Sequence, residues 1–264
     1  MFYPKAKNIL YNRSLFERLI NNNIPRNILT IQYRMQTNIR QIISSLFYEN
    51  KLMDSSDKNY IYKVNNNDLY KIIDINKNFY FFDVNFSEEN FDEMNKSYYN
   101  LQEIDFSLLL LQKINNNLKN NHYISNDYKY AIITPYQAQV KKFKEKIYKN
   151  QDLCDVDIRI NTVDSFQGQE RDIIFFSTVR SSNKASSINN GDVESIGFLN
   201  DYRRMNVGLS RAKLGCFVIG NSQKLKKDQY WEKLIDFCKD KKCIYAIDSL
   251  NQYNHAMESI FLNN

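Results

Sequence analysis

Residue types that could do chemistry gather in a few short segments, each of which joins an apolar run to an abrupt polar end. The segments are Gln32–Met35, Thr134–Gln137, Asn161–Glu170 and Gly197–Ala212. Among their side chains, Arg34 and Arg211 carry planar guanidinium groups, which can bind a phosphate through paired hydrogen bonds. The segments therefore favour a ligand that carries phosphate, provided that the fold brings the two arginines to one opening.

The apolar runs between these segments predict an α/β fold. Short runs rich in Ile, Val, Phe and Tyr alternate with helical patterns. This order is typical of a doubly wound, mostly parallel sheet with helices on both faces. The expected strands are 28–33, 79–84, 130–134, 158–163, 173–179, 216–220 and 243–246.

Capping residues predict where two of the helices begin. Asn100 and Glu103 form a capping box, so a helix is expected from residue 101 onward. A second helix is expected with Thr134 as its cap, Pro135 at its first position and Gln137 reaching back. Because Thr134 also ends a predicted strand, this segment lies at the carboxyl edge of the sheet, where open α/β folds bind ligands.

Composition narrows the class of protein without identifying it. The chain has 264 residues, 43% hydrophobic and 25% charged, as globular domains do, and its net charge of +6 is compatible with a polyanionic partner. The 4 cysteines form no Cys-x-x-Cys pair and the 2 histidines lie far from them, so no metal site is expected. No apolar run approaches the roughly 18 residues of a membrane span, and no signal peptide is recognisable, so neither a membrane-spanning nor a secreted protein is expected.

In their order and spacing, the polar segments resemble motifs of the second RecA-like domain of superfamily 1B helicases. The similarity is greatest to the branch that holds the up-frameshift helicase and senataxin, and it runs from Ser14–Leu19 to beyond Gly220 and as far as Trp231. The resemblance implies a RecA-like α/β fold, ATP with Mg²⁺ as cofactor, and single-stranded RNA, or else DNA, as partner.

The resemblance also assigns residues to the nucleotide. It gives Arg34 and Arg211 the role of arginine fingers on the terminal phosphate, which is a catalytic role. It implies that Tyr33 stacks on adenine, and that Glu170, after a tight turn at Gly168, accepts hydrogen bonds from the ribose. The alternative is that Arg34 and Glu170 are ordinary, half-solvated surface charges.

A second set of residues lies where the family holds its nucleic-acid strand. A motor that moves along any sequence must bind phosphate and sugar, so hydroxyl and main-chain groups are expected to dominate. The set is Thr134, Pro135, Tyr136, Thr162, Asp164, Ser165 and Arg180. The alternatives are that Thr134 is only a helix cap, Ser165 only a turn hydroxyl and Tyr136 a core aromatic.

The phosphate-binding loop that ATP hydrolysis needs is not recognisable. Gly215 and Gly220 have the glycine spacing of such a loop, but the residues between them read as a strand. Asp92-Glu93 follows no apolar strand and is a poor candidate for the acidic pair that positions Mg²⁺. These groups are therefore expected from a first RecA-like domain, and the chain is expected to be a fragment or half of a split enzyme.

The same comparison predicts the domain organisation. Residues 1–26 resemble the tail of the preceding RecA-like domain, 27–247 form the second one, and 248–264 are a C-terminal extension. The Ser/Asn-rich stretch 181–195 is expected to be a mobile insertion. Gly208 and Ser210 depart from the family pattern, in which Ala and Thr are usual.

The leading hypothesis is the C-terminal motor domain of an ATP-dependent, 5′-to-3′ RNA helicase, active when joined to the first RecA-like domain. Its expected role is in nonsense-mediated decay or transcript processing, in the cytoplasm or alternatively the nucleus. One alternative is a non-catalytic module that binds single-stranded nucleic acid or has a regulatory role. Another is a DNA helicase of the same superfamily, since only contacts to the 2′-hydroxyl would separate the two substrates.

Overall fold

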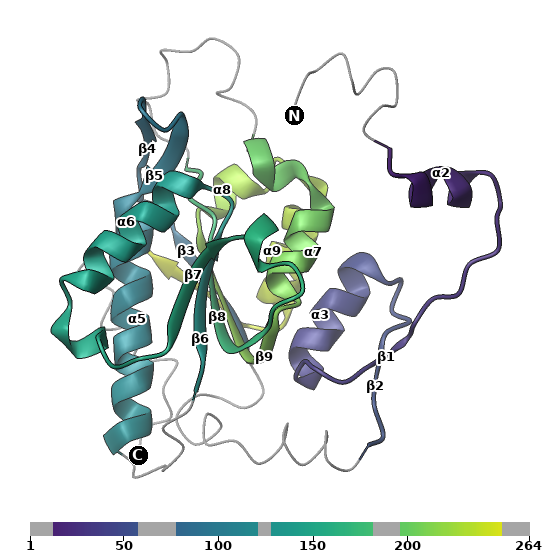
Figure 1. The fold of residues 1–264 in the computed structure, drawn as a ribbon, viewed down its shortest axis with the longest axis horizontal. Coiled ribbons are helices and arrows are strands. Elements are labelled where there is room, and N and C mark those ends of the chain that lie inside the picture. Colours follow the sequence, from purple (N-terminus) through teal and green to yellow (C-terminus); the bar gives the residue numbers. More distant parts are fainter. Residues whose placement is uncertain (1–12, 58–77, 121–127, 182–195, 250–264) are drawn as a thin grey trace. The chain divides into compact units, whose positions relative to one another are not determined.

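The structure is a computed structural model, and it describes residues 13–57, 78–120, 128–181 and 196–249 (Figure 1). The chain divides into two compact units, Met1–Thr30 and Ile31–Asn264. In the first unit, helix α2 (Leu15–Asn21) begins at Ser14, whose hydroxyl accepts a hydrogen bond from the Glu17 N–H at 3.1 Å. None of the side chains of α2 is buried.

The second unit is organised around a parallel sheet of 6 strands in the order β10-β3-β9-β8-β6-β7. The strands are β3 (Phe79–Val84), β6 (Tyr130–Thr134), β7 (Ile158–Thr162), β8 (Arg171–Ser177), β9 (Ala212–Gly220) and β10 (Ile244–Ile247). Each matches a strand expected from the sequence to within a few residues. The parallel α/β fold class is therefore confirmed, and β9 runs straight through the Gly215 to Gly220 spacing.

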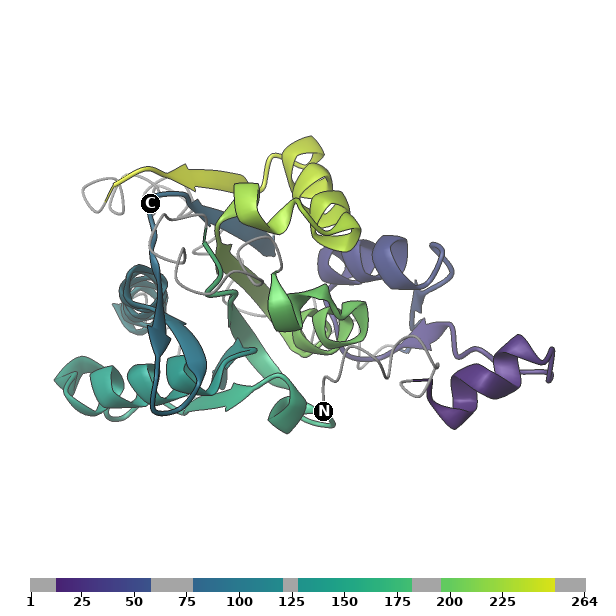
Figure 2. The same ribbon diagram turned by 90° about the horizontal axis from the view of Figure 1, so that it is seen from above.

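Helices cover both faces of this sheet, as Figure 2 shows. Helices α5 (Leu101–Asn120) and α6 (Gln137–Tyr148) lie on one face. Helices α3 (Thr37–Phe47), α7 (Tyr202–Leu209) and α9 (Gln229–Asp240) lie on the other. The shorter helical segments are η3 (Gln151–Leu153), η4 (Asp164–Phe166), η6 (Gly197–Asn200) and α8 (Ser222–Leu225).

Two small sheets were not expected. Strands β1 (Ile31–Gln32) and β2 (Met53–Asp54) pair in parallel, and β4 (Glu89–Asp92) and β5 (Ser97–Asn100) form an antiparallel hairpin. The strand expected over 28–33 is thus wrong in its extent, because only 2 of its residues find a partner strand. Leu29 is 86% exposed, which shows that its apolar character does not reflect burial here.

Aromatic side chains fill the core at the centre of the sheet. Phe217 of β9 stacks on Tyr80 of β3 at 5.7 Å and contacts Phe175 of β8 at 5.2 Å between ring centroids. Phe82 meets Phe106 of α5 at 4.9 Å, so the sheet and helix layers interlock. The four central strands, β3, β9, β8 and β6, are largely buried on both faces, which explains why they read as continuous apolar runs instead of alternating ones.

The predicted start of α6 is wrong by two residues. The helix begins at Gln137 with Tyr136 as its N-cap residue, and Thr134 belongs wholly to β6. In the first turn, the Ala138 N–H instead donates to the Ser97 hydroxyl of β5 at 3.2 Å. The N-terminal end of α6 therefore depends on the hairpin, a contact that no local sequence pattern contains.

Some expectations lie outside the described residues. These are residues 1–12 of the predicted tail, the predicted insertion beyond Ser181 and most of the predicted C-terminal extension. Among the residues that are described, no helix combines the length and apolar character that crossing a membrane requires.

Candidate functional site

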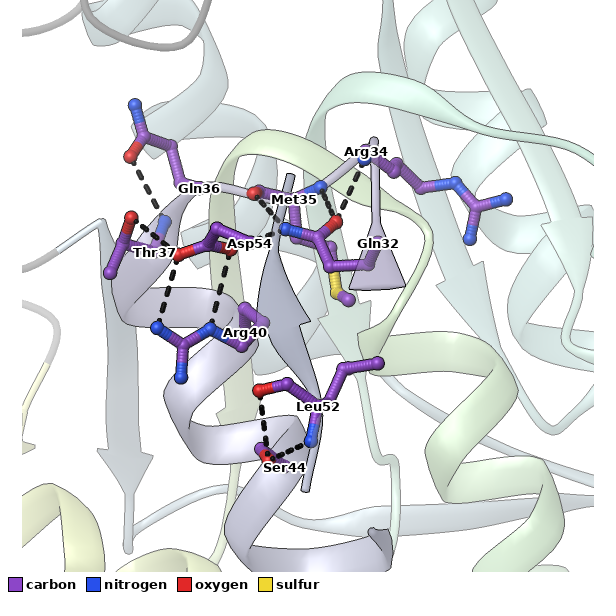
Figure 3. Close-up of polar contacts among 9 residues, drawn as sticks. All are labelled: Gln32, Arg34, Met35, Gln36, Thr37, Arg40, Ser44, Leu52 and Asp54. Atoms are coloured by element: carbon purple, nitrogen blue, oxygen red, sulfur yellow. Dashed lines mark hydrogen bonds and ion pairs between the residues drawn. The ribbon is translucent and has the colours of Figure 1, made fainter. Parts of the chain in front are cut away.

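The turn that carries Arg34 is held rigidly by Gln32 (Figure 3). The Gln32 side-chain oxygen accepts hydrogen bonds from the N–H groups of Arg34 (2.8 Å) and Met35 (2.7 Å). Its amide nitrogen donates to the Met35 carbonyl at 2.9 Å and to Asp54 at 2.6 Å. Figure 3 shows that the Arg34 side chain extends away from this cluster, so the turn aims the guanidinium elsewhere.

Asp54 and Gln36 connect this turn to the elements around it. Burial raises the pKa of Asp54, but hydrogen bonds from Arg40, Gln32 and Thr37 outweigh it and lower that pKa. The Gln36 N–H donates to the Lys213 carbonyl at 2.8 Å, which joins the turn to the start of β9. The Gln36 side chain also caps α3 by accepting a hydrogen bond from the Thr37 N–H, so Gln36 links the turn to both α3 and β9.

The two predicted arginines converge on Ser210. A guanidinium nitrogen of Arg34 donates to the Ser210 carbonyl, and one of Arg211 donates to the Ser210 hydroxyl, both at 3.2 Å. Arg211 also donates to the Val207 carbonyl of α7 at 3.0 Å. Burial, and then the neighbouring charge of Arg34, lower the pKa of Arg211. The structure thus brings together two guanidinium groups that lie far apart in the sequence.

Glu170 lies between the cations of this cluster. Its carboxylate accepts from Arg34 at 2.6 Å and forms an ion pair with Lys213 at 3.2 Å. Burial raises its pKa, but the bonds from Arg34 and Lys213 outweigh burial and lower it, so the group is an anion at neutral pH. Gly168, two residues earlier, has φ of +79°, the conformation that the predicted tight turn requires.

Lys213 was missed by sequence reasoning. It is the second residue of β9, and Arg211 lies two residues before it, immediately ahead of the strand. That spacing could have identified it as a third cation of the cluster. Tyr33, which was predicted, is 67% exposed. The cluster of Arg34, Glu170, Arg211 and Lys213 lies at the amino ends of β8 and β9, and we call it the guanidinium cluster.

The exposed members of the predicted strand-binding set are Asp164 and Ser165, which follow β7, and the last residue of β7, Thr162, is half-buried. Thr162 is the register partner of Thr134 at the carboxyl end of β6. The Thr162 hydroxyl donates to the Ser165 hydroxyl at 3.0 Å and accepts from the Ser165 N–H at 3.4 Å. Asp164, whose side chain is 66% exposed, forms a two-armed ion pair with Arg204 of α7 at 2.8 and 3.0 Å.

Other members of the set are buried. Thr134 and Tyr136 are both buried. The Tyr136 hydroxyl donates to the Ile196 carbonyl at 3.3 Å, and burial raises the pKa of Tyr136 to about 12. Arg180 is 2% exposed; it pairs with buried Glu89 at 2.9 Å and lies over the Tyr98 ring at 4.4 Å. The structure therefore does not expose the Arg180 guanidinium or the Tyr136 ring to a strand.

A strained turn at Val179 sets the path of the chain after β8. Val179 has φ of +71°, and the Arg180 N–H donates to the Thr178 carbonyl at 2.8 Å, which makes a positive-φ γ-turn. Glu103 of α5 accepts from the Val179 N–H at 2.9 Å, and Asn100 donates to the Val179 carbonyl at 3.1 Å. Such strain costs about 1–3 kcal/mol, so the surrounding bonds must hold it.

The parallel sheet with helices on both faces defines the class of protein, an α/β domain of the RecA-like type. The chain matches the family model described as an AAA domain over residues 11–223. It is 34% identical over 258 residues to Helicase SEN1 of Saccharomyces cerevisiae, and 31% identical over 260 residues to the regulator of nonsense transcripts 1 homolog of Drosophila melanogaster. The chain therefore belongs to the AAA domain family, and its similarity to these helicases places it in the superfamily 1 helicase family.

These alignments cover 97% and 96% of this chain. They cover 11% of the yeast protein and 20% of the fly protein. An archaeal relative, an uncharacterized ATP-dependent helicase of Methanocaldococcus jannaschii, is 33% identical over 246 residues, which is 89% of this chain and 32% of that protein. The chain thus spans at most a third of the length of these relatives.

Proposed function

We propose that this chain is the C-terminal motor domain of an ATP-dependent RNA helicase that moves from 5′ to 3′. Arg34 and Arg211 act as arginine fingers on a nucleotide whose phosphates are held mainly by a first RecA-like domain. The observation that supports this most directly is the convergence of both guanidinium groups on Ser210. Family membership supplies the second line of support.

The guanidinium cluster fits a triphosphate in its chemistry. Three cations, Arg34, Arg211 and Lys213, lie around a single carboxylate, that of Glu170, so the described charges leave an excess that phosphate would balance. We assign adenine stacking to Tyr33 and ribose binding to Glu170. Mg²⁺, when bound with ATP, supplies electrophilic assistance at the phosphates, and its ligands belong to the first RecA-like domain.

The single-stranded nucleic acid binds at the carboxyl ends of β6 and β7. We assign contacts to the hydroxyls of half-buried Thr162 and exposed Ser165, and to the main chain of Thr134 and Pro135. Burial gives Tyr136 and Arg180 a supporting role beneath this surface. One relative is named as a regulator of nonsense transcripts, which favours RNA as the substrate and transcript decay or processing, in the cytoplasm or nucleus, as the setting.

The test is RNA-stimulated ATPase activity of the chain joined to its upstream domain. Loss of an arginine finger costs about 10³ to 10⁵ in turnover, so Arg211→Ala should abolish measurable stimulation. Arg203→Ala is the matched control, because Arg203 is an exposed arginine of α7 outside the guanidinium cluster. Turnover by Arg211→Ala within twofold of the unmodified protein would contradict the assignment.

A further inference from the structure

Arg204 occupies a junction between the proposed strand surface and the guanidinium cluster. It projects from α7, and its guanidinium holds the Asp164 carboxylate of η4 through two hydrogen bonds, at 2.8 and 3.0 Å. It also lies over the Phe198 ring of η6 at 5.2 Å. The Phe198 ring in turn meets the edge of Tyr136 at 5.9 Å, so Arg204 contacts two segments that border the carboxyl edge of the sheet.

The same helix carries the groups that orient the two arginine fingers. The Val207 carbonyl accepts from Arg211, and Ser210, the C-cap of α7, contacts both Arg34 and Arg211. Arg204 and Val207 are three residues apart, which is less than one helical turn and a rise of about 4.5 Å. A displacement of η4 that pulls on Arg204 would therefore shift the carbonyl that positions Arg211.

The pairing also changes the expected role of Asp164. A carboxylate repels phosphate, and this one already accepts both arms of a guanidinium. The hydroxyls of Thr162 and Ser165 lie beside it in the sequence and can contact a strand without that repulsion. Asp164 is therefore better suited to hold Arg204 than to hold nucleic acid.

We propose that the Asp164–Arg204 pair is a positioning device that couples strand binding at η4 to the orientation of the arginine fingers through α7. This inference rests on the proposed function. Because the Asp164 side chain is 66% exposed, the pair contributes little to stability, about 0–1 kcal/mol. The Arg204 side chain is only 22% exposed, so the thermal unfolding midpoint is measured to separate a loss of turnover from a loss of stability.

The experiment uses the full-length protein and compares Asp164→Asn, Arg204→Gln and the charge swap Asp164→Arg/Arg204→Asp. The readouts are turnover at saturating RNA, the RNA dissociation constant by fluorescence anisotropy, and the thermal unfolding midpoint. We expect both single variants to lose at least about fivefold in RNA-stimulated turnover, within the usual range of coupling between sites, with RNA affinity within about threefold. The swap should recover most of the turnover.

Lys226→Gln is the control, because the Lys226–Asp236 pair has comparable exposure and joins α8 to α9 instead. Stimulated turnover within twofold of the unmodified protein in both single variants would overturn the inference. So would an RNA affinity that falls in Asp164→Asn as much as turnover and is not restored by the swap, since Asp164 would then contact the strand directly. If the unmodified protein shows no RNA-stimulated ATPase, the proposed function itself fails.

Discussion

At the scale of the residue, Glu103 shows that a side chain can fit a local pattern and act elsewhere. The sequence predicts a capping box, and Asn100 does cap α5 by accepting from the Glu103 N–H at 3.1 Å. The Asn100 N–H, however, donates to the side-chain oxygen of Gln139 in α6 at 2.8 Å, and not to Glu103. The Glu103 carboxylate is thus available for Val179 and for the Ser177 hydroxyl, which donates at 2.6 Å.

The pH dependence of stability should report on this buried carboxyl. Burial raises the pKa of Glu103 from 4.5 to about 8, despite hydrogen bonds from Ser177 and Val179 that lower it. Between these two values the folded state keeps a proton that the unfolded state has released. The carboxyl therefore contributes stability below its unfolded pKa, and this contribution is lost as pH rises through the folded pKa, by up to about 1.4 kcal/mol per pH unit.

Glu103→Gln copies the protonated form and should remove this dependence. Urea unfolding is measured at intervals between pH 4.5 and about 8. The free energy of unfolding of Glu103→Gln should rise relative to that of the unmodified protein as pH increases. Glu103→Ala should instead lose about 1–3 kcal/mol at acidic pH, because it leaves the buried Val179 N–H without its acceptor. Glu145→Gln, at an exposed position of α6, is the control. Parallel pH profiles for Glu103→Gln and the unmodified protein would refute the assignment.

Residue type alone could not separate binding from structural roles in the candidate site. Arg34 and Arg211 were predicted from type and order, and the structure brings them together. Arg180 and Tyr136 were predicted in the same way, yet both are buried, because their partners Glu89 and Ile196 lie far away in the sequence. Such pairings depend on tertiary contacts that no local spacing contains.

At the scale of the element, helix α7 and strand β8 approach unusually closely at Gly208. A Cβ atom at this position would lie 2.2 Å from a ring carbon of Phe176. In sequence terms Gly208 is a departure from the family pattern that weakens a helix. The structure gives the physical reason, since the Phe176 ring occupies the space that an alanine methyl would need.

Gly208→Ala should therefore destabilise the protein despite the better helix propensity of alanine. Propensity favours the variant by about 1 kcal/mol, but overpacking a well-filled core costs roughly 1–3 kcal/mol. Chemical denaturation should show a net loss for Gly208→Ala that is largely recovered when Phe176→Leu is added. Arg203→Ala on the same helix should change the free energy of unfolding by less than about 0.5 kcal/mol. If Gly208→Ala were more stable than the unmodified protein, the prediction would be wrong, because the Phe176 ring could then move aside at little energetic cost.

The elements that sequence reasoning missed share a physical cause. The central strands are long and buried on both faces, so their apolar runs are unmistakable. Strands β4 and β5 are short and largely polar, and their position is fixed by distant contacts. The Glu89 carboxylate of β4 accepts from the Ser181 N–H at 2.7 Å and pairs with Arg180. These contacts form only when the hairpin packs against the end of β8, so no local sequence pattern predicts them.

At the scale of the whole sheet, the topology places the two proposed ligand surfaces at opposite edges. The guanidinium cluster lies at the amino ends of β8 and β9, whereas Thr162 ends β7 and Ser165 follows it. Sequence order intermixes the two groups, since Ser165 and Glu170 are only five residues apart. Only the parallel register of β6 with both β7 and β8 shows that the chain crosses from one edge to the other between them.

This separation predicts that the two affinities can be altered independently. Among the described residues, no hydrogen bond or ion pair joins the side chains of Thr162 and Ser165 to the guanidinium cluster, because the two hydroxyls bond to each other. Removing a charge of the guanidinium cluster therefore breaks no hydrogen bond that the two hydroxyls make. In the full-length protein, Arg34→Gln should weaken the binding of a fluorescent ATP analogue at least about tenfold, the effect of losing a charged phosphate contact.

The complementary variant, Thr162→Val with Ser165→Ala, should weaken RNA binding several-fold and leave nucleotide affinity within twofold. Each dissociation constant is measured without the other ligand, so that coupling between occupied sites does not enter. The two hydroxyls bond to each other at the end of β7, and Thr162→Val keeps the β-branched shape of the residue, so their loss should not disturb the sheet. If either variant changed both affinities equally, the two groups would belong to one continuous site, and the division of labour between the edges of the sheet would be wrong.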